Sequence, residues 1–178
     1  MPNDSVFNQS SQPLFTEQVN TYVAPGIDSA PEGGAAKAGL LFGIPFTSTV
    51  TTTAPLVIQI SNPAGSGRTL YVSRVTASSA TAAVTLSLLR NATVTGTTVT
   101  PINYNFGSAL TSVMTARTST AAPTGSPATL VSLLLAVGPI IVDFTGQIVV
   151  PPGNSITTSI TIASGSSAAT TSISWWEY

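Results

Sequence analysis

The chain has 178 residues and a formal net charge of −1, and only 6% of its residues are charged, against about 25% in an ordinary soluble domain. It contains no Cys and no His, which excludes disulfides, thiolate nucleophiles, Cys/His zinc sites and imidazole acid–base chemistry. The near-zero net charge also argues against a nucleic-acid partner, whose phosphates attract many Lys and Arg side chains.

Hydroxyl side chains replace the missing charges. The chain has 23 Ser and 28 Thr, so these two residue types make up about 29% of it. Thr, Val and Ile favour strands because branching at Cβ suits a pleated surface. A freely diffusing protein stays soluble largely through surface charge. We therefore expect a β-rich subunit that packs among copies of itself.

Residues 1–40 are predicted to form an extended N-terminal arm, separate from a body at residues 41–178. This part of the chain has no strand-length alternation, and Pro and Gly interrupt any regular element, at Pro25, Pro31, Gly33, Gly34 and Gly39. One short piece, "PLFTEQVNTYVA" at residues 13–24, has the composition to add as a strand to another sheet.

Short alternating runs separated by turn residues begin at about Leu41. The predicted strands cover residues 56–60, 68–77, 83–91, 129–137, 147–150, 155–163 and 170–178. Alternation with a period of two, with a turn about every 8 to 12 residues, is typical of all-β sandwiches and barrels. About eight strands fit a jelly-roll-like antiparallel β-sandwich.

The side-chain pattern predicts which face of each strand meets the core. In residues 83–91, Val84, Leu86 and Leu88 share one face. In residues 155–163, Ile156, Ile160 and Ile162 share one face and the residues Thr157, Ser159 and Thr161 share the other. In residues 68–77, strict alternation places Leu70, Val72, Arg74 and Thr76 opposite Tyr71, Ser73 and Val75.

The run at residues 129–137 is apolar on both faces. If Val131, Leu133, Leu135 and Val137 face the core, then Leu130, Leu134 and Ala136 face outward. The outer face of a two-layer sandwich normally meets water and is polar. Leu130 and Leu134 are therefore candidates for a subunit interface, and a covering loop or arm is the alternative.

The C-terminal stretch "SISWWEY" places three aromatic rings in the last four residues. Trp175 and Trp176 are adjacent, so in a strand they point to opposite faces and only one can fill the core. The other indole, together with Tyr178, is covered by a loop or the arm, contacts another subunit, or stacks on a sugar.

The arm and the body have net charges of opposite sign. The arm has four acidic side chains and one basic one, a net charge of −3, whereas the body carries four Arg and two acids, a net charge of +2. We therefore expect the arm to dock on a body, its own or a neighbour's, through Glu17, Asp28 and Glu32. Arg74 and Arg90 lie in predicted strands and are the candidate partners.

No catalytic, metal or cofactor site is expected. Outside the arm the only carboxylates are Asp143 and Glu177, and nothing in the sequence supports their convergence on one bond. The N-terminal "MPNDSVFNQS" lacks the basic and apolar regions of a signal peptide. The longest apolar run, residues 130–142, is too short and too interrupted to insert into a membrane.

Three stretches resemble small spore-associated and surface proteins of endospore-forming Gram-positive bacteria: "SNPAGSGRTLYVSRVT" (61–76), "GQIVVPPGNSITTSI" (146–160) and "SISWWEY" (172–178). The pattern of residues 41–178 is also similar to that of the jelly-roll subunits of endospore appendage fibres. This resemblance implies an N-terminal connector that reaches into a neighbouring subunit. Appendage connectors form cross-links through Cys, which is absent here, so any such linkage would be noncovalent.

The leading hypothesis is a structural subunit that assembles with copies of itself into an extracellular fibre or surface layer, at a spore or cell surface and with a possible surface anchor protein as a further partner. The first alternative is a jelly-roll structural or decoration protein of a phage or other virion. The second is a carbohydrate-binding module that uses the C-terminal rings.

Overall fold

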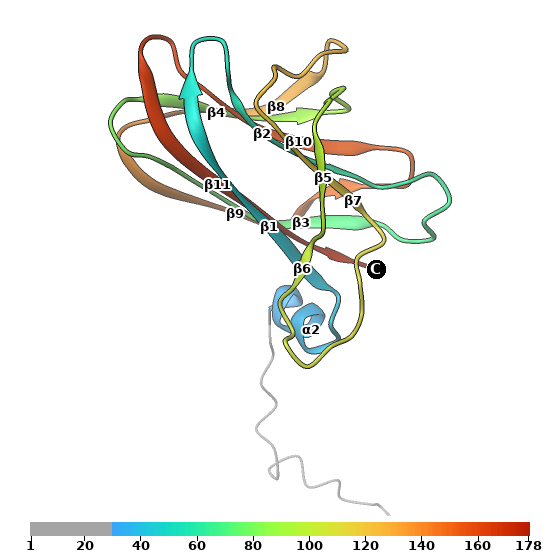
Figure 1. Cartoon of the computed structure of the whole chain (residues 1–178). Coiled ribbons are helices and arrows are strands. Elements are labelled where there is room, and N and C mark those ends of the chain that lie inside the picture. Colours follow the sequence, from blue (N-terminus) through green and yellow to red (C-terminus); the bar gives the residue numbers. More distant parts are fainter. Residues whose placement is uncertain (1–29) are drawn as a thin grey trace, which may run out of the picture.

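The computed structural model describes residues 30–178 as one short helix followed by eleven strands (Figure 1). Two of the proposed arm contacts, Glu17 and Asp28, lie outside the described residues. The helix is α2 (Pro31–Lys37). The strands are β1 (Leu41–Thr51), β2 (Leu56–Ser61), β3 (Leu70–Ser79), β4 (Val84–Arg90), β5 (Thr97–Val99), β6 (Ile102–Asn103), β7 (Thr115–Ser119), β8 (Ala128–Leu135), β9 (Gly138–Val150), β10 (Ser155–Thr161) and β11 (Ser166–Glu177).

The strands form two antiparallel sheets, packed face to face as the two layers in Figure 1. One sheet has the order β6-β1-β11-β3-β9, and the other has the order β5-β7-β2-β10-β4-β8. Their facing side chains make one large core, in which Phe42, Leu56, Leu86, Ile160 and Trp175 are almost wholly buried. The predicted all-β sandwich is confirmed, and the inward faces predicted for residues 83–91 and 155–163 are confirmed with it.

The predicted alternation across residues 68–77 is wrong beyond Val72. Both Val72 and Val75 are buried, while Arg74 between them is exposed. The cause is a bulge in β3: Val72 pairs with Trp175 of β11 and Arg74 pairs with Ser174, so Ser73 is an extra residue without a partner on β11. This bulge reverses the phase of the strand and keeps apolar side chains inward on both sides of it.

The segment between β4 and β8 adds three short strands, β5, β6 and β7, that the sequence did not predict. Part of this segment covers the outer face of the six-stranded sheet, where Val57 packs with Ala92 and Val94 in a second small cluster. Gln59 donates a hydrogen bond from Nε2 to the Ala92 carbonyl at 2.6 Å. Thr157 and Ser159, which alternation alone would expose, are buried on the same strand pair.

Helix α2 lies in the region that was predicted to have no regular element. The residues at its two ends favour a helix: Pro31 and acidic Glu32 lie in the first turn, and basic Lys37 lies in the last turn. Gly39 adopts a φ of +70° and donates to the Ala36 carbonyl, while Leu40 donates to the Ala35 carbonyl, which is the pattern of a Schellman cap. Gly39 therefore ends a helix, and the helix contacts β1, β9 and β11.

Candidate functional site

The two sides of the sandwich end in very different edge strands. On one side the sheets end in β6, with two residues, and β5, with three. On the other side they end in β8, with eight residues, and β9, with thirteen. An edge strand presents unpaired N–H and C=O groups, and natural proteins usually shorten it, charge it or cover it. We call the side formed by β8 and β9 the open edge.

The open edge carries exposed apolar side chains. The exposed fraction is 46% for Leu130, 81% for Leu134 and 61% for Ile141. The predicted exposure of Leu130 and Leu134 is confirmed, but the outward orientation of Leu130 is not, because it lines a groove beside the core residue Ile156. The register of β8 shifts beside Leu130, where Val131 pairs with Leu88 and Thr129 pairs with Leu89. Val137 was predicted to face the core and is 55% exposed. The reason is that β8 ends at Leu135, and the chain turns through Gly138, whose φ is +122°.

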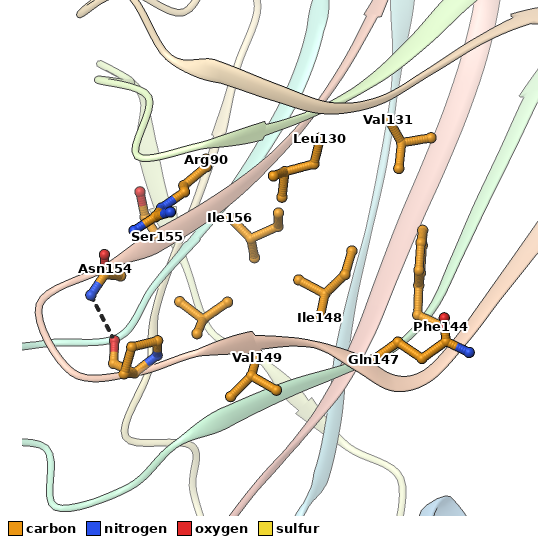
Figure 2. Close-up of a pocket in the computed structure, with 12 residues that line it drawn as sticks. Arg90, Leu130, Val131, Phe144, Gln147, Ile148, Val149, Asn154, Ser155 and Ile156 are labelled. Atoms are coloured by element: carbon orange, nitrogen blue, oxygen red, sulfur yellow. Dashed lines mark hydrogen bonds between the residues drawn. The ribbon is translucent and has the colours of Figure 1, made fainter.

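A groove of about 700 Å³ lies between β8 and β9 along this edge (Figure 2). We call it the edge groove. In Figure 2, Leu130 and Val131 of β8 face Ile148 and Phe144 of β9, and Ile156 of β10 lies between the two walls. Ile156 and Phe144 also belong to the main core. The groove is therefore a place where the apolar interior of the sandwich reaches the surface.

One end of the edge groove is polar. Arg90 lies there at the end of β4, beside Asn154 and Ser155 (Figure 2). The Asn154 amide is already hydrogen-bonded, since its Nδ2 donates to the Pro151 carbonyl and its Oδ1 accepts from Asn91. Within residues 30–178, neither of the two ion pairs includes Arg90. The guanidinium is an exposed cation beside an apolar groove.

Arg74 has a partner in the body itself. Its Nε donates to Asp143 Oδ1 at 2.5 Å, across the directly paired strands β3 and β9. Arg74 and Glu32 of α2 line the same cavity of about 580 Å³, together with Tyr104, but they form no ion pair with each other. Burial raises the pKa of the Tyr104 phenol, and the nearby Arg74 guanidinium acts in the opposite direction.

The three C-terminal rings have three different environments. Trp175 is wholly buried in the core, where it packs near Phe42 with a centroid distance of 6.4 Å. Trp176 points to the outer face and stacks on Tyr71, with ring centroids 5.5 Å apart and planes 9° from parallel. Tyr178 is 84% exposed. Of the three interface candidates, Tyr178 is the most accessible, and Trp176 is covered on one face by its own sheet.

Sequence reasoning missed the structural role of Glu177. Its side chain is wholly buried and accepts hydrogen bonds from Ser112 Oγ, from the Val113 amide at 3.1 Å and from Trp175 Nε1 at 3.1 Å. Arg68 Nη1 lies 3.8 Å from its Oε2. The available signal was its position two residues after Trp175, which places both side chains on the same face of a strand. Glu177 thereby ties the segment before β7 to the end of the chain.

The described part of the chain contains no group of three or more carboxylate, His or Cys side chains that could hold a metal ion. Asp143 and Glu177 engage different partners, Arg74 in one case and Ser112 in the other. Among residues 30–178, no helix has both the length and the hydropathy needed to cross a membrane. Comparisons with family models, with curated proteins and with solved structures found no match to the chain.

Proposed function

We propose that the protein is a structural subunit that assembles with copies of itself into an extracellular fibre or surface layer. The open edge is the observation that carries this proposal. Eight residues of β8 contain no charged side chain and no Pro, and the thirteen residues of β9 contain only Asp143 and Pro139. An edge this long and this apolar is a template for pairing with another chain.

The opposite side of the sandwich supports the same interpretation. There the outermost strands have only two and three residues, so they offer few unpaired backbone groups to a partner. A protein that only needed to avoid aggregation would be expected to shorten both sides. Protection of one side and exposure of the other is what directional assembly through a single edge requires.

The N-terminal arm is the proposed partner of the open edge in a neighbouring subunit. An extended segment that adds to a sheet edge gains main-chain hydrogen bonds, and pockets for alternate side chains give the contact its specificity. Because an arm and an edge are different surfaces, the contact is heterologous. A heterologous contact that does not close into a ring produces a filament.

Strand order supports a jelly roll as the fold of this subunit. If the three short strands between β4 and β8 are set aside, the sheets have the orders β1-β11-β3-β9 and β2-β10-β4-β8. These are eight strands in two four-stranded sheets, and consecutive strands alternate between the sheets except at β4 and β8, which are neighbours in one sheet. This order is typical of the double Greek key of jelly rolls. The short strands are then an insertion between the fourth and fifth strands.

A virion structural protein would use the same edge, and DNA-filled particles that copurify with the protein would favour that role. A sugar-stacking platform has less support from the geometry. It needs open aromatic faces, whereas Trp175 is buried and Trp176 stacks on Tyr71, which leaves Tyr178 as the one largely exposed ring of the three.

The test is negative-stain electron microscopy with sedimentation velocity on the full chain and on a variant that lacks residues 1–29. This truncation leaves α2 and its contacts with the body in place. We expect polymers from the full chain and folded monomers or small oligomers from the truncated one. A full chain that stays monomeric at micromolar to millimolar concentration contradicts the proposal, and polymers of normal length from the truncated chain contradict the role of the arm.

A further inference from the structure

We infer that the edge groove is the docking site for residues 13–24 of a second copy of the chain, with Glu17 of that copy placed against Arg90. This inference rests on the proposed function, and it adds the site, the segment and the charge contact. It requires that the groove accept an apolar strand, that residues 13–24 supply one, and that the charges of the two match.

The groove meets the first requirement through its lining. Its walls are Leu130 and Val131 on one side and Ile148 on the other, and core residue Ile156 lies between them (Figure 2). Both walls belong to strands whose outer backbone edge has no strand partner within residues 30–178. An added strand would therefore find apolar contacts and free backbone groups at the same place.

Residues 13–24 meet the second requirement by their sequence, "PLFTEQVNTYVA". In an extended strand, alternate side chains share a face, which here carries Pro13, Phe15, Glu17, Val19, Thr21 and Val23. This face therefore presents four apolar side chains, the Thr21 hydroxyl and one carboxylate. Twelve extended residues span about 40 Å, which is enough to follow either edge strand.

The charges of the groove and of residues 13–24 meet the third requirement. Arg90 stands at the polar end of the groove, and neither ion pair within residues 30–178 involves it. Glu17 is the only charged residue in residues 13–24. A carboxylate carried on an apolar strand matches a guanidinium beside an apolar groove, and Arg pairs with carboxylates in a fixed geometry.

The part of the arm before Ala30, residues 1–29, is long enough to reach another subunit. A domain of this size is about 40 Å across, and the 29 residues before Ala30 can extend to about 95 Å. The described chain begins at Ala30, which lines the cavity shared with Asp143 and Thr145 of β9. Ala30 is therefore placed beside the middle of β9, whose residues from Phe144 to Val150 contribute to the groove.

The experiment reverses each charge in the full-length chain. The variants are Glu17→Arg, Arg90→Glu and the double variant, with Arg117→Glu as the control because Arg117 is an exposed strand Arg outside the groove. The critical concentration for assembly is measured by light scattering and sedimentation, alongside thermal unfolding of each variant. The two single variants are also mixed in equal amounts.

We expect each single reversal to raise the critical concentration about fivefold or more, because a like-charge contact replaces an attractive one. The double variant and the equal mixture should both return close to the original value, since in the mixture each arm meets a groove of opposite charge. Arg117→Glu should leave the critical concentration within about twofold of the original.

The possible negative results distinguish a wrong docking site from a wrong proposed function. If the unaltered chain assembles and the single reversals do not change its critical concentration, the site is wrong and the structural role stands. If the critical concentration returns to the original value in the double variant but not in the mixture, the arm docks in the groove of its own chain. The inference that it docks on a second copy is then wrong. If the unaltered chain does not assemble at all, the proposed function falls with the inference.

Discussion

The indole Nε1 of Trp175 donates a hydrogen bond to the carboxylate of Glu177, two residues further along β11, and both side chains are wholly buried. The same carboxylate accepts from Ser112 and from the Val113 amide. A buried carboxylate is stable only when its oxygens are paired and hydrogen-bonded. The end of β11 is therefore held by a polar cluster as well as by its strand neighbours.

We predict that Glu177→Ala lowers the free energy of unfolding by at least about 3 kcal/mol, because it leaves the donors of Trp175 and Val113 buried without an acceptor. Glu177→Gln keeps one acceptor oxygen and should lower it by less. Urea denaturation followed by tryptophan fluorescence measures both. A loss below about 1 kcal/mol for Glu177→Ala would show that the cluster does not hold the strand end.

Gly146 allows Trp176 to lie flat on the sheet. Its φ is +85°, and a Cβ added there would be 2.5 Å from Trp176 Cη2. Gly65 has a similar φ of +81° with nothing within 4 Å of the added Cβ, so Gly65→Ala is the matched control. Both changes force a residue with a side chain into the left-handed region, at about 1–2 kcal/mol.

We predict that Gly146→Ala is more destabilising than Gly65→Ala by about 1–3 kcal/mol, because only the first also displaces the indole from Tyr71. Thermal unfolding gives the difference, and near-UV circular dichroism reports the stacking of Trp176 on Tyr71. Equal destabilisation by the two variants, with an unchanged near-UV spectrum, would mean that the close approach at Gly146 has no consequence.

Thr158 has a buried hydroxyl oxygen without a hydrogen-bond partner. We predict that Thr158→Val raises the free energy of unfolding by about 1 kcal/mol, because it removes an unsatisfied polar group and keeps the shape of the side chain. Thr171→Val is the contrasting variant, since its Oγ1 donates to the Thr76 carbonyl at 2.8 Å and the change should destabilise. Chemical denaturation of both variants decides the sign, and destabilisation by Thr158→Val would contradict the assignment.

Tyr104 makes stability depend on alkaline pH. Its folded-state pKa is raised, chiefly by burial, so the neutral phenol is favoured in the folded chain. The resulting contribution to the free energy of unfolding is fully present below the unfolded-state pKa of about 10. It is lost as the pH rises through the folded-state pKa of Tyr104. We predict that Tyr104→Phe makes the fall in melting temperature above pH 10 shallower. If the melting temperature falls equally steeply with pH in the variant, Tyr104 does not contribute to the loss of stability at alkaline pH.

Sequence patterns predicted the strands that alternate without interruption, such as β4 and β10, because their inward residues are continuous. They failed at β3, where the bulge depends on the pairing with β11 and changes which residues face inward after Val72. They also missed β5 and β6, which are shorter than the two or three repeats that alternation needs to be recognised. Helix α2 was not predicted because Pro and Gly residues indicate a break in regular structure, whereas here Pro31 begins the helix and Gly39 caps it.

The candidate site was predictable only in part. An apolar strand on both faces predicted the exposure of Leu134, since one face of an edge strand must leave the core. The edge groove was not predictable, because it depends on which strands end each sheet. The role of Glu177 depends on Ser112 and Val113, and no pattern within the last strand points to partners that far away in the chain.

Sedimentation velocity on the full chain and on the double variant Leu134→Lys, Ile141→Lys shows whether the open edge joins copies of this chain. Both positions are exposed, so their replacement should change the stability of the monomer by less than about 1 kcal/mol, and Lys on an edge strand opposes pairing. We predict polymers from the unaltered chain and monomers from the variant, with similar melting temperatures. Equal polymerisation of the two chains, or monomers from both, would contradict it.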